Sequence, residues 1–227
     1  MCIRDRIGTP AWQTADLSSL RMMAIGSTDV PVALIEAVHA RGIPVIQVYG
    51  TTETSPTAIY QTADIATATV GSIGRAGSRC EIRITGDDGT ELPVGEVGEI
   101  RVRGDNILTR YWNNEAASAE SIVDGWFRTG DMARLDADGL YWFADRLKHV
   151  IISGGENIYP AELERVLADY DGLTEFAVVG RDDPRWGQVP VIVAARSGPT
   201  VTGDAVLAHF EGRIARFKRP KDVVFVK

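Results

Sequence analysis

Apolar positions in the first fifty residues repeat first at strand spacing, then at helix spacing, then at strand spacing again. Residues 22–25 and 43–48 are short apolar runs that predict buried strands. Residues 31–41 carry apolar side chains at helical spacing, with Pro31 in the first turn and Gly42 just past the end. A strand, a helix and a strand in so short a segment predict a βαβ unit with a parallel sheet.

Between residues 70 and 145 the pattern changes to alternation, which is typical of antiparallel strands with one solvated face. The strand-like runs here are 80–85, 98–103, 126–128, 132–135 and 140–143. Asp-x-Asp-Gly and similar turns separate them, as in hairpins. In the second run we expect Glu99, Arg101 and Arg103 to face solvent. The region predicts a β-rich layer beside the parallel sheet.

The last third predicts a compact α+β domain over residues 146–227. Its expected elements are a strand at 150–152, a helix from Ala161 to about 169 that Pro160 opens, strands at 176–179 and 189–194, an amphipathic helix at 203–216 and a final strand at 222–226. Upstream, Asn113 or Asn114 is expected to cap a short helix that runs to Ile122.

Composition excludes several classes of protein. The 227 residues are 44% hydrophobic, enough for one sizeable core or two modest ones. A formal charge of −7 argues against general nucleic-acid binding. No apolar run is long enough for a membrane span, and no signal peptide is visible. Two cysteines and three histidines suggest neither a disulfide framework nor a zinc site, so a reducing cytoplasm is the expected compartment.

Both ends of the chain suggest that it is part of something longer. Residues 1–6, MCIRDR, look like translated sequencing-adapter sequence, and the chain stops within a strand pattern at 222–227. We therefore expect the native protein to extend beyond both ends.

Candidate phosphate chemistry lies at residues 49–54, YGTTET, directly after the second predicted strand. In open parallel sheets, ligands bind beyond the carboxyl ends of the strands. Backbone N–H groups and threonine hydroxyls can bind phosphate oxygens, Glu53 offers hard oxygens for Mg²⁺, and Tyr49 offers a flat face for a base. The alternative is a threonine-rich loop with a core tyrosine. Gly26, Ser27 and Thr28 follow the first strand in the same way.

A second group of charged residues occurs where strands are expected to give way to loops: Asp131, Asp145, Arg146 and Lys148. A carboxylate in such a place can accept both hydroxyl protons of a ribose. An arginine nearby suits ribose or phosphate oxygens. Taken singly, each of them is also explained as a turn residue or a solvated charge.

Longer motifs decide between these interpretations. GWFRTGD, GLYWFADRLKHVI, SGGENIYPAELE and YGTTE resemble the adenylate-forming (AMP-binding) superfamily, which includes acyl-CoA synthetases, adenylation domains and luciferases. The resemblance runs from about Arg21 to Lys227. It implies the end of a large AMP-binding domain over 1–145, with a βαβ piece and a β-rich distorted barrel, and a small mobile domain over 146–227.

The resemblance assigns a role to each residue of a nucleotide site. It implies that Tyr49 packs on adenine, Thr52 contacts the AMP phosphate, Glu53 binds Mg²⁺, Asp131 binds the ribose hydroxyls and Arg146 contacts ribose or phosphate. Gly26, Ser27 and Thr28 line the adenine pocket, and Gly50 and Thr51 complete the phosphate loop. Thr52, Glu53 and Lys148 are the catalytic candidates, with Lys148 as the hinge about which the last domain rotates.

A local basic cluster near the end of this acidic chain suggests an anionic partner. Its members are Arg213, Arg216, Lys218, Arg219 and Lys221, beside Phe217. A solvated helix end is the plainer explanation. The string FKRPK resembles the CoA-nucleotide site of CoA ligases, which implies adenine on Phe217 and phosphates on Arg219 and Lys221. Gly154, Gly155 and Trp186 would then lie along the pantetheine path.

The expected function is therefore that of an acyl-CoA synthetase acting on a fatty or aryl acid, with ATP, Mg²⁺ and CoA. Alternatives are an adenylation module that loads a carrier protein and a non-catalytic incomplete piece. Two departures from the family pattern occur: Ala76 replaces a usual proline, and His149 replaces a usual acidic residue. The glycine- and threonine-rich phosphate loop and the C-terminal catalytic lysine do not occur, so we expect residues 1–227 alone not to adenylate.

Overall fold

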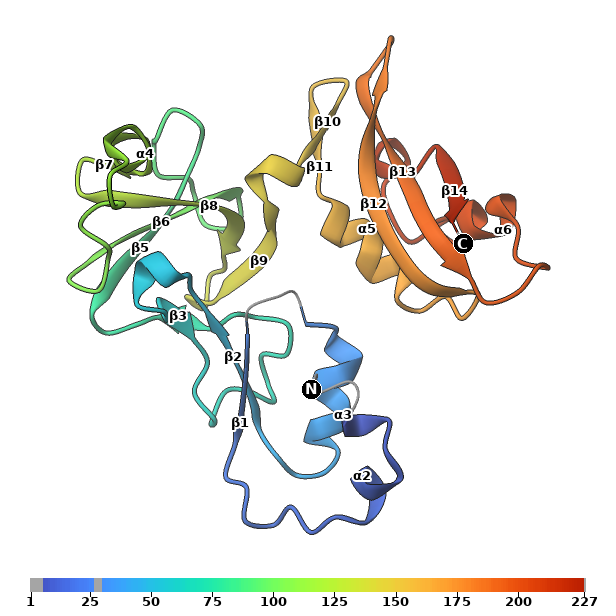
Figure 1. The fold of residues 1–227 in the computed structure, drawn as a ribbon, viewed down its shortest axis with the longest axis horizontal. Helices are drawn as coiled ribbons and strands as arrows, with labels where there is room; N and C mark the ends of the chain where they lie inside the picture. The colour runs from blue at the N-terminus through green and yellow to red at the C-terminus, as the bar shows by residue number, and fades with distance from the viewer. Residues whose placement is uncertain (1–5, 27–29, 227) are drawn as a thin grey trace. The chain divides into compact units, whose positions relative to one another are not determined.

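The computed structural model describes residues 6–26 and 30–226, and the chain divides into two compact units (Figure 1). The first unit comprises residues 1–129 and 133–143, and the second comprises 130–132 and 144–227. The described residues form a four-stranded sheet and two five-stranded sheets. The division into domains at 145/146 stays a prediction.

The first sheet contains the predicted βαβ unit. Its strands, in the order β1-β2-β3-β4, are β1 (Met23–Gly26), β2 (Val45–Tyr49), β3 (Ile59–Tyr60) and β4 (Arg75–Ala76). Strands β1 and β2 are parallel, with Met23 opposite Val45. Helix α3 (Val32–His39) connects them and buries Ile35 and Val38, because those two side chains share one helical face. A short helix, α2 (Pro10–Thr14), precedes the unit.

The second sheet is antiparallel in its described pairings and forms the β-rich part of the first unit. Its strands are β5 (Cys80–Thr85), β6 (Val97–Gly104), β7 (Ile122–Val123), β8 (Trp126–Leu135) and β9 (Tyr141–Arg146), in the order β5-β6-β8-β7 with β9 paired to β8. Helix α4 (Glu115–Ser121) begins where Asn114 accepts a hydrogen bond from the Ala117 N–H at 3.0 Å. Asn114, and not Asn113, is therefore the cap.

Two expectations for this sheet are wrong. The runs 126–128 and 132–135 form one strand, so Asp131 lies inside β8 and not at a strand end. Glu99 was expected to face solvent but is 6% exposed. Its carboxylate lies 3.1 Å from Arg128 Nε and 3.4 Å from Arg101 Nε, and these cations stabilise the buried charge.

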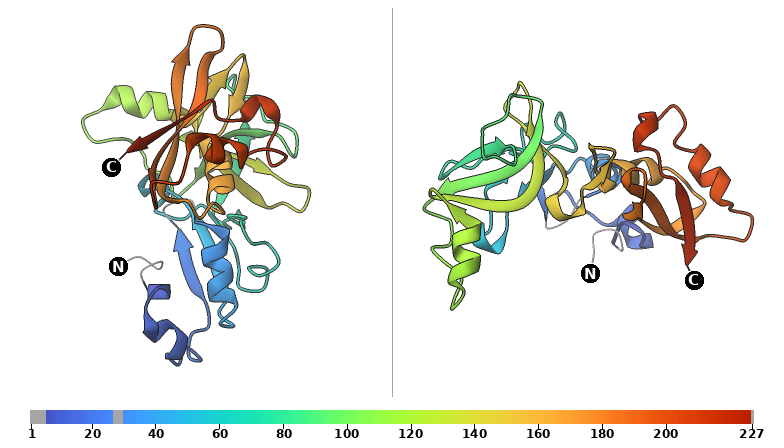
Figure 2. Two further views of the ribbon diagram at one scale, coloured as in Figure 1. Left: turned by 90° about the vertical axis from the view of Figure 1, so that its right-hand side faces the viewer. Right: turned by 90° about the horizontal axis from the view of Figure 1, so that it is seen from above.

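The third sheet belongs to the second unit. Its strands are β10 (Ile151–Ser153), β11 (Glu156–Ile158), β12 (Leu173–Asp183), β13 (Gly187–Arg196) and β14 (Asp222–Val226), in the order β11-β10-β13-β12 with β14 parallel to β13. The β12–β13 hairpin forms a long arm in Figure 1 and in the left view of Figure 2.

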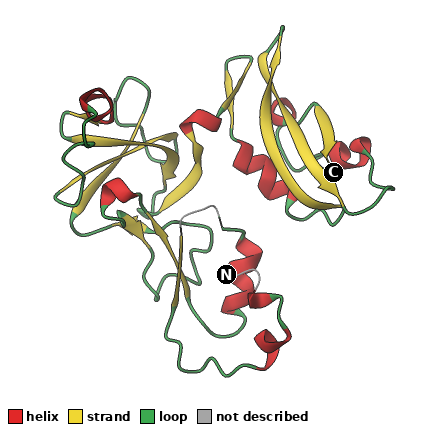
Figure 3. Cartoon of the chain, in the orientation of Figure 1, coloured by secondary structure: helices red, strands yellow, loops and turns green. Residues whose placement is uncertain are grey.

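Two helices complete the core of the second unit, shown in red in Figure 3. Helix α5 (Pro160–Leu167) buries Leu163 and Leu167. Helix α6 (Gly203–Ala208) buries Val206, and Phe210 just after it is fully buried in the same cluster. The described residues also include the short 3₁₀ turns η1 (Thr52–Thr54), η2 (Leu147–His149) and η3 (Arg216–Lys218).

The helix expected over 203–216 is much shorter in the structure. It ends at Ala208, and the chain continues through turns to η3. Gly212 lies at φ = +72°, a left-handed conformation that reverses the chain direction and suits glycine. The basic cluster therefore lies in turns after α6 and is not the end of a long helix.

Among the described residues, none of the helices is long and apolar enough to cross a membrane.

Candidate functional site

The YGTTET loop follows β2 and is held by hydrogen bonds of its own. The Thr51 N–H donates to Thr54 Oγ1 at 2.9 Å, and the Thr54 hydroxyl lies 3.0 Å from the Pro56 carbonyl. At Gly50, a Cβ would stand 1.7 Å from that same carbonyl oxygen, so no other residue fits without moving the backbone. The loop is thus fixed, and Thr52 is left exposed at its surface.

Glu53 has a partner that the sequence did not reveal. The Tyr111 hydroxyl donates to Glu53 Oε1 at 3.0 Å, and the Leu108 N–H donates to the Glu53 carbonyl at 2.9 Å. Burial acts to raise the pKa of Glu53, but hydrogen bonds from its own backbone and from Tyr111 outweigh it, so the pKa lies below its ordinary value. Burial and the adjacent Glu53 raise the pKa of Tyr111. Glu53 is therefore an ionised carboxylate at neutral pH.

A single carboxylate fits Mg²⁺ but not a protein-enclosed metal. Within residues 6–26 and 30–226, no three His, Cys, Asp or Glu side chains gather as a metal-binding group. Mg²⁺ characteristically takes one or two carboxylates and completes its shell with substrate phosphates and water. Glu53 meets that requirement as a hard, charged oxygen donor.

Of the residues predicted around adenine, Tyr49 and Gly26 lie in the described part of the chain. Tyr49 is half-buried, packs against the apolar core of the β-rich sheet, and lies 6.5 Å from the Phe143 ring. Gly26 ends β1, where a Cβ would stand 2.5 Å from the Val48 carbonyl oxygen of the neighbouring strand. Ser27 and Thr28 lie outside the described residues.

In the second unit, the structure brings Asp131 and Arg146 together. They come from β8 and β9, which pair, and Arg146 Nε lies 3.5 Å from Asp131 Oδ1. Asp131 is buried, with 9% of its side chain exposed, whereas 56% of the Arg146 side chain is exposed. A buried carboxylate with an accessible guanidinium is an arrangement that suits the hydroxyls and phosphate of a nucleotide.

The Asp145 side chain, next to Arg146, accepts hydrogen bonds from two backbone N–H groups. Its Oδ2 accepts the Ala161 N–H at 2.8 Å, and its Oδ1 accepts the Arg146 N–H at 2.7 Å. His149 Nδ1 lies 3.5 Å from the same Oδ1. The hinge candidate Lys148 follows in the exposed turn η2. The segment that holds Lys148 is therefore tied to the beginning of α5.

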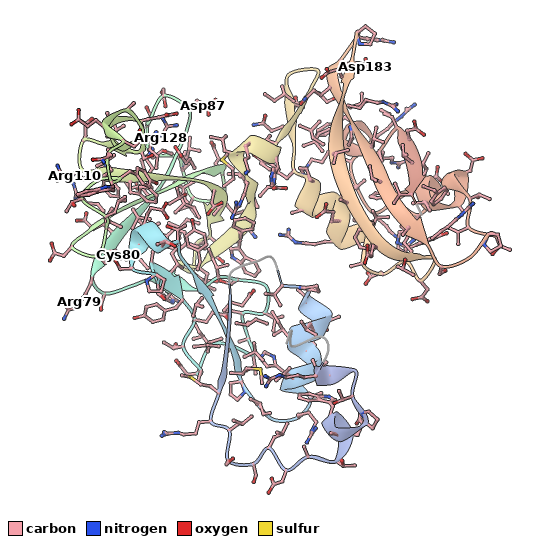
Figure 4. All side chains as sticks on the ribbon, viewed as in Figure 1. Arg79, Cys80, Asp87, Arg110, Arg128 and Asp183 are labelled. Atoms are coloured by element: carbon pink, nitrogen blue, oxygen red, sulfur yellow. The ribbon has the colours of Figure 1, made fainter. Side chains whose placement is uncertain are left out.

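Gly154, Gly155 and Trp186 also lie together. Both glycines have positive φ, +61° and +87°, and form the turn between β10 and β11. The Gly154 N–H donates to the Trp186 carbonyl at 2.8 Å, and a Cβ on Gly154 would stand 2.8 Å from the indole ring. Asp183, labelled in Figure 4 at the tip of the long hairpin, accepts the Trp186 N–H at 2.9 Å. Trp186 remains 44% exposed.

The FKRPK segment lines a hollow of about 340 Å³ in the second unit. The hollow is lined by Asp204, Leu207, Ala208, Glu211, Arg216, Arg219, Pro220 and Lys221. Arg219 and Lys221 therefore line the same hollow, and their role toward CoA stays a prediction. Phe217 is 47% exposed but is not among the lining residues.

Two family models match the chain. The model described as AMP-binding enzyme matches residues 3–112, and the model described as AMP-binding enzyme C-terminal domain matches residues 162–227.

The chain belongs to the AMP-binding enzymes.

Curated AMP-binding relatives are similar over almost the whole chain. It is 53% identical over 221 residues to indoleacetate–CoA ligase from Aromatoleum aromaticum, covering 97% of this chain and 43% of that protein. It is 43% identical to feruloyl-CoA synthase from Amycolatopsis, over 95% of this chain and 44% of that protein. It is 42% identical to 2-succinylbenzoate–CoA ligase from Bacillus cereus, over 98% of this chain and 45% of that protein. The chain thus spans less than half the length of these relatives.

Solved AMP-binding enzymes share the fold. The ATP-bound MatB from Rhodopseudomonas palustris matches with a TM-score of 0.91 at 30% identity, covering 99% of this chain and 45% of that one. o-Succinylbenzoate CoA synthetase (MenE) from Bacillus subtilis, in complex with its acyl-adenylate intermediate, matches with a TM-score of 0.88 at 34% identity, covering 95% and 44%. The predicted fold class, with mixed sheets and a curled β-rich part, is confirmed.

Sequence reasoning missed three contacts of this AMP-binding enzyme: Tyr111 to Glu53, Asp145 to the Ala161 N–H, and Lys218 to Glu162. Each joins residues that lie far apart in the chain, and no local pattern of periodicity or turn chemistry signals such a pairing.

Proposed function

We propose that this chain belongs to an ATP-dependent acid–CoA ligase acting on an aryl or fatty carboxylic acid. The observation that carries the proposal is the 42–53% identity to three CoA ligases over at least 95% of the chain. The fixed YGTTET loop, the Asp131–Arg146 pair and the Gly154–Trp186 contact support it, because each motif that carries the resemblance adopts a defined local geometry.

The proposed reaction has two steps. A carboxylate oxygen attacks the α-phosphorus of ATP, the bond to the bridging oxygen breaks, and acyl-AMP and pyrophosphate form. The thiol of CoA then loses its proton and attacks the acyl carbon, and the products are the thioester and AMP. The first step requires charge stabilisation at the phosphate, and the second requires a path for the thiol.

In the first step, we assign the nucleotide to residues of the loop and of strands β8 and β9. Tyr49 packs on adenine beside Gly26, Ser27 and Thr28, while Gly50, Thr51 and Thr52 bind phosphate. Glu53 would hold Mg²⁺, which neutralises phosphate charge when bound. Asp131 accepts the ribose hydroxyls, and Arg146 binds ribose or phosphate oxygens. The buried position of Asp131 beside the Arg146 guanidinium supports its role, because its carboxylate oxygens can accept hydroxyl protons there.

In the second step, rotation about Lys148 changes which face of the small domain meets the adenylate. Gly154 and Gly155 leave room for pantetheine beside Trp186, and Phe217, Arg219 and Lys221 bind the CoA nucleotide. The exposed rings of Trp186 and Phe217 support this assignment, since exposed aromatic side chains suit stacking on a base or a flat chain. We also propose a cytoplasmic compartment, which the low cysteine content supports.

The test uses the complete gene product that carries this chain. Carboxylate-dependent ATP–pyrophosphate exchange and CoA thioester formation are measured with indoleacetate, ferulate, 2-succinylbenzoate and a long-chain fatty acid. Exchange and thioester formation with at least one acid are expected. Exchange with no thioester formed from CoA contradicts the acceptor assignment and favours a carrier protein. No exchange with any acid favours a non-catalytic protein.

Phe217→Ala and Arg219→Ala separate CoA from a carrier protein more finely. Each removes a proposed contact with the CoA nucleotide and leaves the adenylation residues in place. We expect KM for CoA to rise about tenfold, equivalent to about 1.4 kcal/mol, with the exchange rate unchanged. An unchanged dependence on CoA would contradict the assignment of these residues.

A further inference from the structure

Lys218 differs from the other cations of the basic cluster in that a carboxylate of α5 holds it through two hydrogen bonds. Its Nζ donates to both carboxylate oxygens of Glu162, at 2.9 and 2.7 Å, and only 22% of its side chain is exposed. Glu162 lies in the first turn of α5, where a carboxylate is favoured by the helix dipole. By contrast, Arg216 and Lys221 are exposed. One cation of FKRPK is therefore already neutralised within the protein.

This ion pair holds one residue of a tight turn. Residues Arg216–Lys218 form a 3₁₀ turn, in which successive side chains point about 120° apart because there are about three residues per turn. Phe217, next to Lys218 in this turn, is 47% exposed. The Lys218 ammonium lies 5.9 Å from the Phe217 ring centroid.

The other end of the segment is held as well. Pro220 is buried, and the Lys221 N–H donates to the Pro190 carbonyl at 2.9 Å. Arg219 lies between this backbone anchor and the Lys218 ion pair. Its guanidinium approaches Glu211 at 3.9 Å, and its Nε is buried without a hydrogen-bond partner. The segment is thus fixed on both sides of Arg219.

We propose that Glu162 and Lys218 are positioning residues that preorganise Phe217 and Arg219 for the CoA nucleotide. This inference rests on the proposed function. Preorganisation raises affinity because the bound geometry no longer has to be ordered on binding. Lys218 itself does not bind phosphate.

If Lys218 contacted phosphate directly, the Glu162→Gln variant would change the affinity for the nucleotide in the opposite direction. If Lys218 bound phosphate, Glu162→Gln would release it and would tighten binding. If the pair positions the segment, Glu162→Gln and Lys218→Met both weaken binding. The sign of the Glu162→Gln effect therefore separates the two roles.

The experiment measures two quantities for each variant. Calorimetry gives the affinity of adenosine 3′,5′-bisphosphate for residues 1–227, and kinetics of the complete gene product give KM for CoA and the exchange rate. The variants are Glu162→Gln, Lys218→Met, their double mutant and the charge swap Glu162→Lys with Lys218→Glu. Arg181→Gln is the control, because it breaks an exposed ion pair of the same unit, with Asp222, that involves neither Glu162 nor Lys218.

We expect each single variant to weaken bisphosphate binding and raise KM for CoA about five- to tenfold, with the exchange rate unchanged. The double mutant should be no worse than either single variant, since one interaction is lost in all three cases. The charge swap should recover most of the loss, which a general loss of stability would not do. Arg181→Gln should match the wild type.

Several results would overturn the inference. Tighter or unchanged bisphosphate binding by Glu162→Gln contradicts the positioning role. An equal loss of affinity in Arg181→Gln contradicts it as well. A charge-swap variant that recovers no affinity also contradicts it. If the wild type binds the bisphosphate but the pair variants match it, only the positioning role fails. If the wild type neither binds the bisphosphate nor uses CoA, the proposed function fails and the positioning role fails with it.

Discussion

Helix α5 receives its N-terminal cap from a distant residue, and removing that cap should loosen the start of the helix. The residue at the N-cap position is Tyr159, whose side chain makes no capping hydrogen bond. Asp145, at the end of β9, supplies the acceptor instead, through Oδ2 and the Ala161 N–H at 2.8 Å. We predict that Asp145→Ala destabilises the first turn of α5 while the β-rich sheet keeps its stability.

The magnitude follows from the burial of both groups. Asp145 is 5% exposed and Ala161 is 7% exposed, so water does not replace the lost carboxylate. An unsatisfied buried N–H costs about 1–3 kcal/mol, and loss of an N-cap side chain costs about 0.5–2 kcal/mol. We therefore expect a loss of about 2 kcal/mol, which is about a 30-fold fall in hydrogen-exchange protection. Asp145→Asn should lose less, because the amide oxygen still accepts a hydrogen bond.

Native-state hydrogen exchange on the full chain measures this directly, amide by amide. Asp171→Ala is the matched control, because Asp171 is an exposed aspartate in the turn after the same helix. Protection of α5 amides in Asp145→Ala that equals protection in Asp171→Ala would refute the reasoning. A uniform loss across both units would also refute it, because the effect would then not be local to the cap.

Three further predictions concern the first unit. Tyr111→Phe removes the hydroxyl that helps to lower the pKa of Glu53, and the pKa of Glu53 should therefore rise toward its ordinary value. NMR titration of the Glu53 carboxyl carbon measures this pKa. An unchanged pKa would contradict the contact between the two side chains. Gly50→Ala places a methyl group against the Pro56 carbonyl and should lower the free energy of unfolding, measured with urea, by about 3 kcal/mol or more. A loss below about 1 kcal/mol would show that the loop relaxes around the added methyl group. Burial acts to raise the pKa of Asp136, but hydrogen bonds from an indole N–H and from backbone N–H groups outweigh it and lower the pKa. The contribution of Asp136 to stability is therefore complete above its unfolded pKa of about 4 and is lost as pH falls through the depressed folded pKa. Asp136→Asn should reduce the pH dependence of stability below about pH 4, as followed by tryptophan fluorescence during acid unfolding. A pH profile equal to that of the wild type would contradict this role.

The sequence by itself determined the elements whose patterns are local. The strand at Cys80–Thr85 has the predicted bounds, and the parallel β1–β2 pair follows from two apolar runs around an amphipathic helix. Turn chemistry located the glycine turn at Gly154 and Gly155, because a two-residue hairpin turn with positive φ favours glycine. Motifs of the AMP-binding family then indicated which loops carry chemistry.

Only the tertiary structure decided how far the local patterns extend and which side chains meet. The 203–216 pattern is helical in period, yet the α-helix ends at Ala208 and gives way to i→i+3 hydrogen-bonded turns, in which Phe210 packs into the core and Gly212 has positive φ. Glu99 alternates as if exposed, but arginines from its own strand and from β8 compensate for its burial. Asp145 capping α5 and Lys218 pairing with Glu162 join groups that are 16 and 56 residues apart. Periodicity reports only on neighbours within a few positions, so pairings formed by folding itself could not be predicted from it.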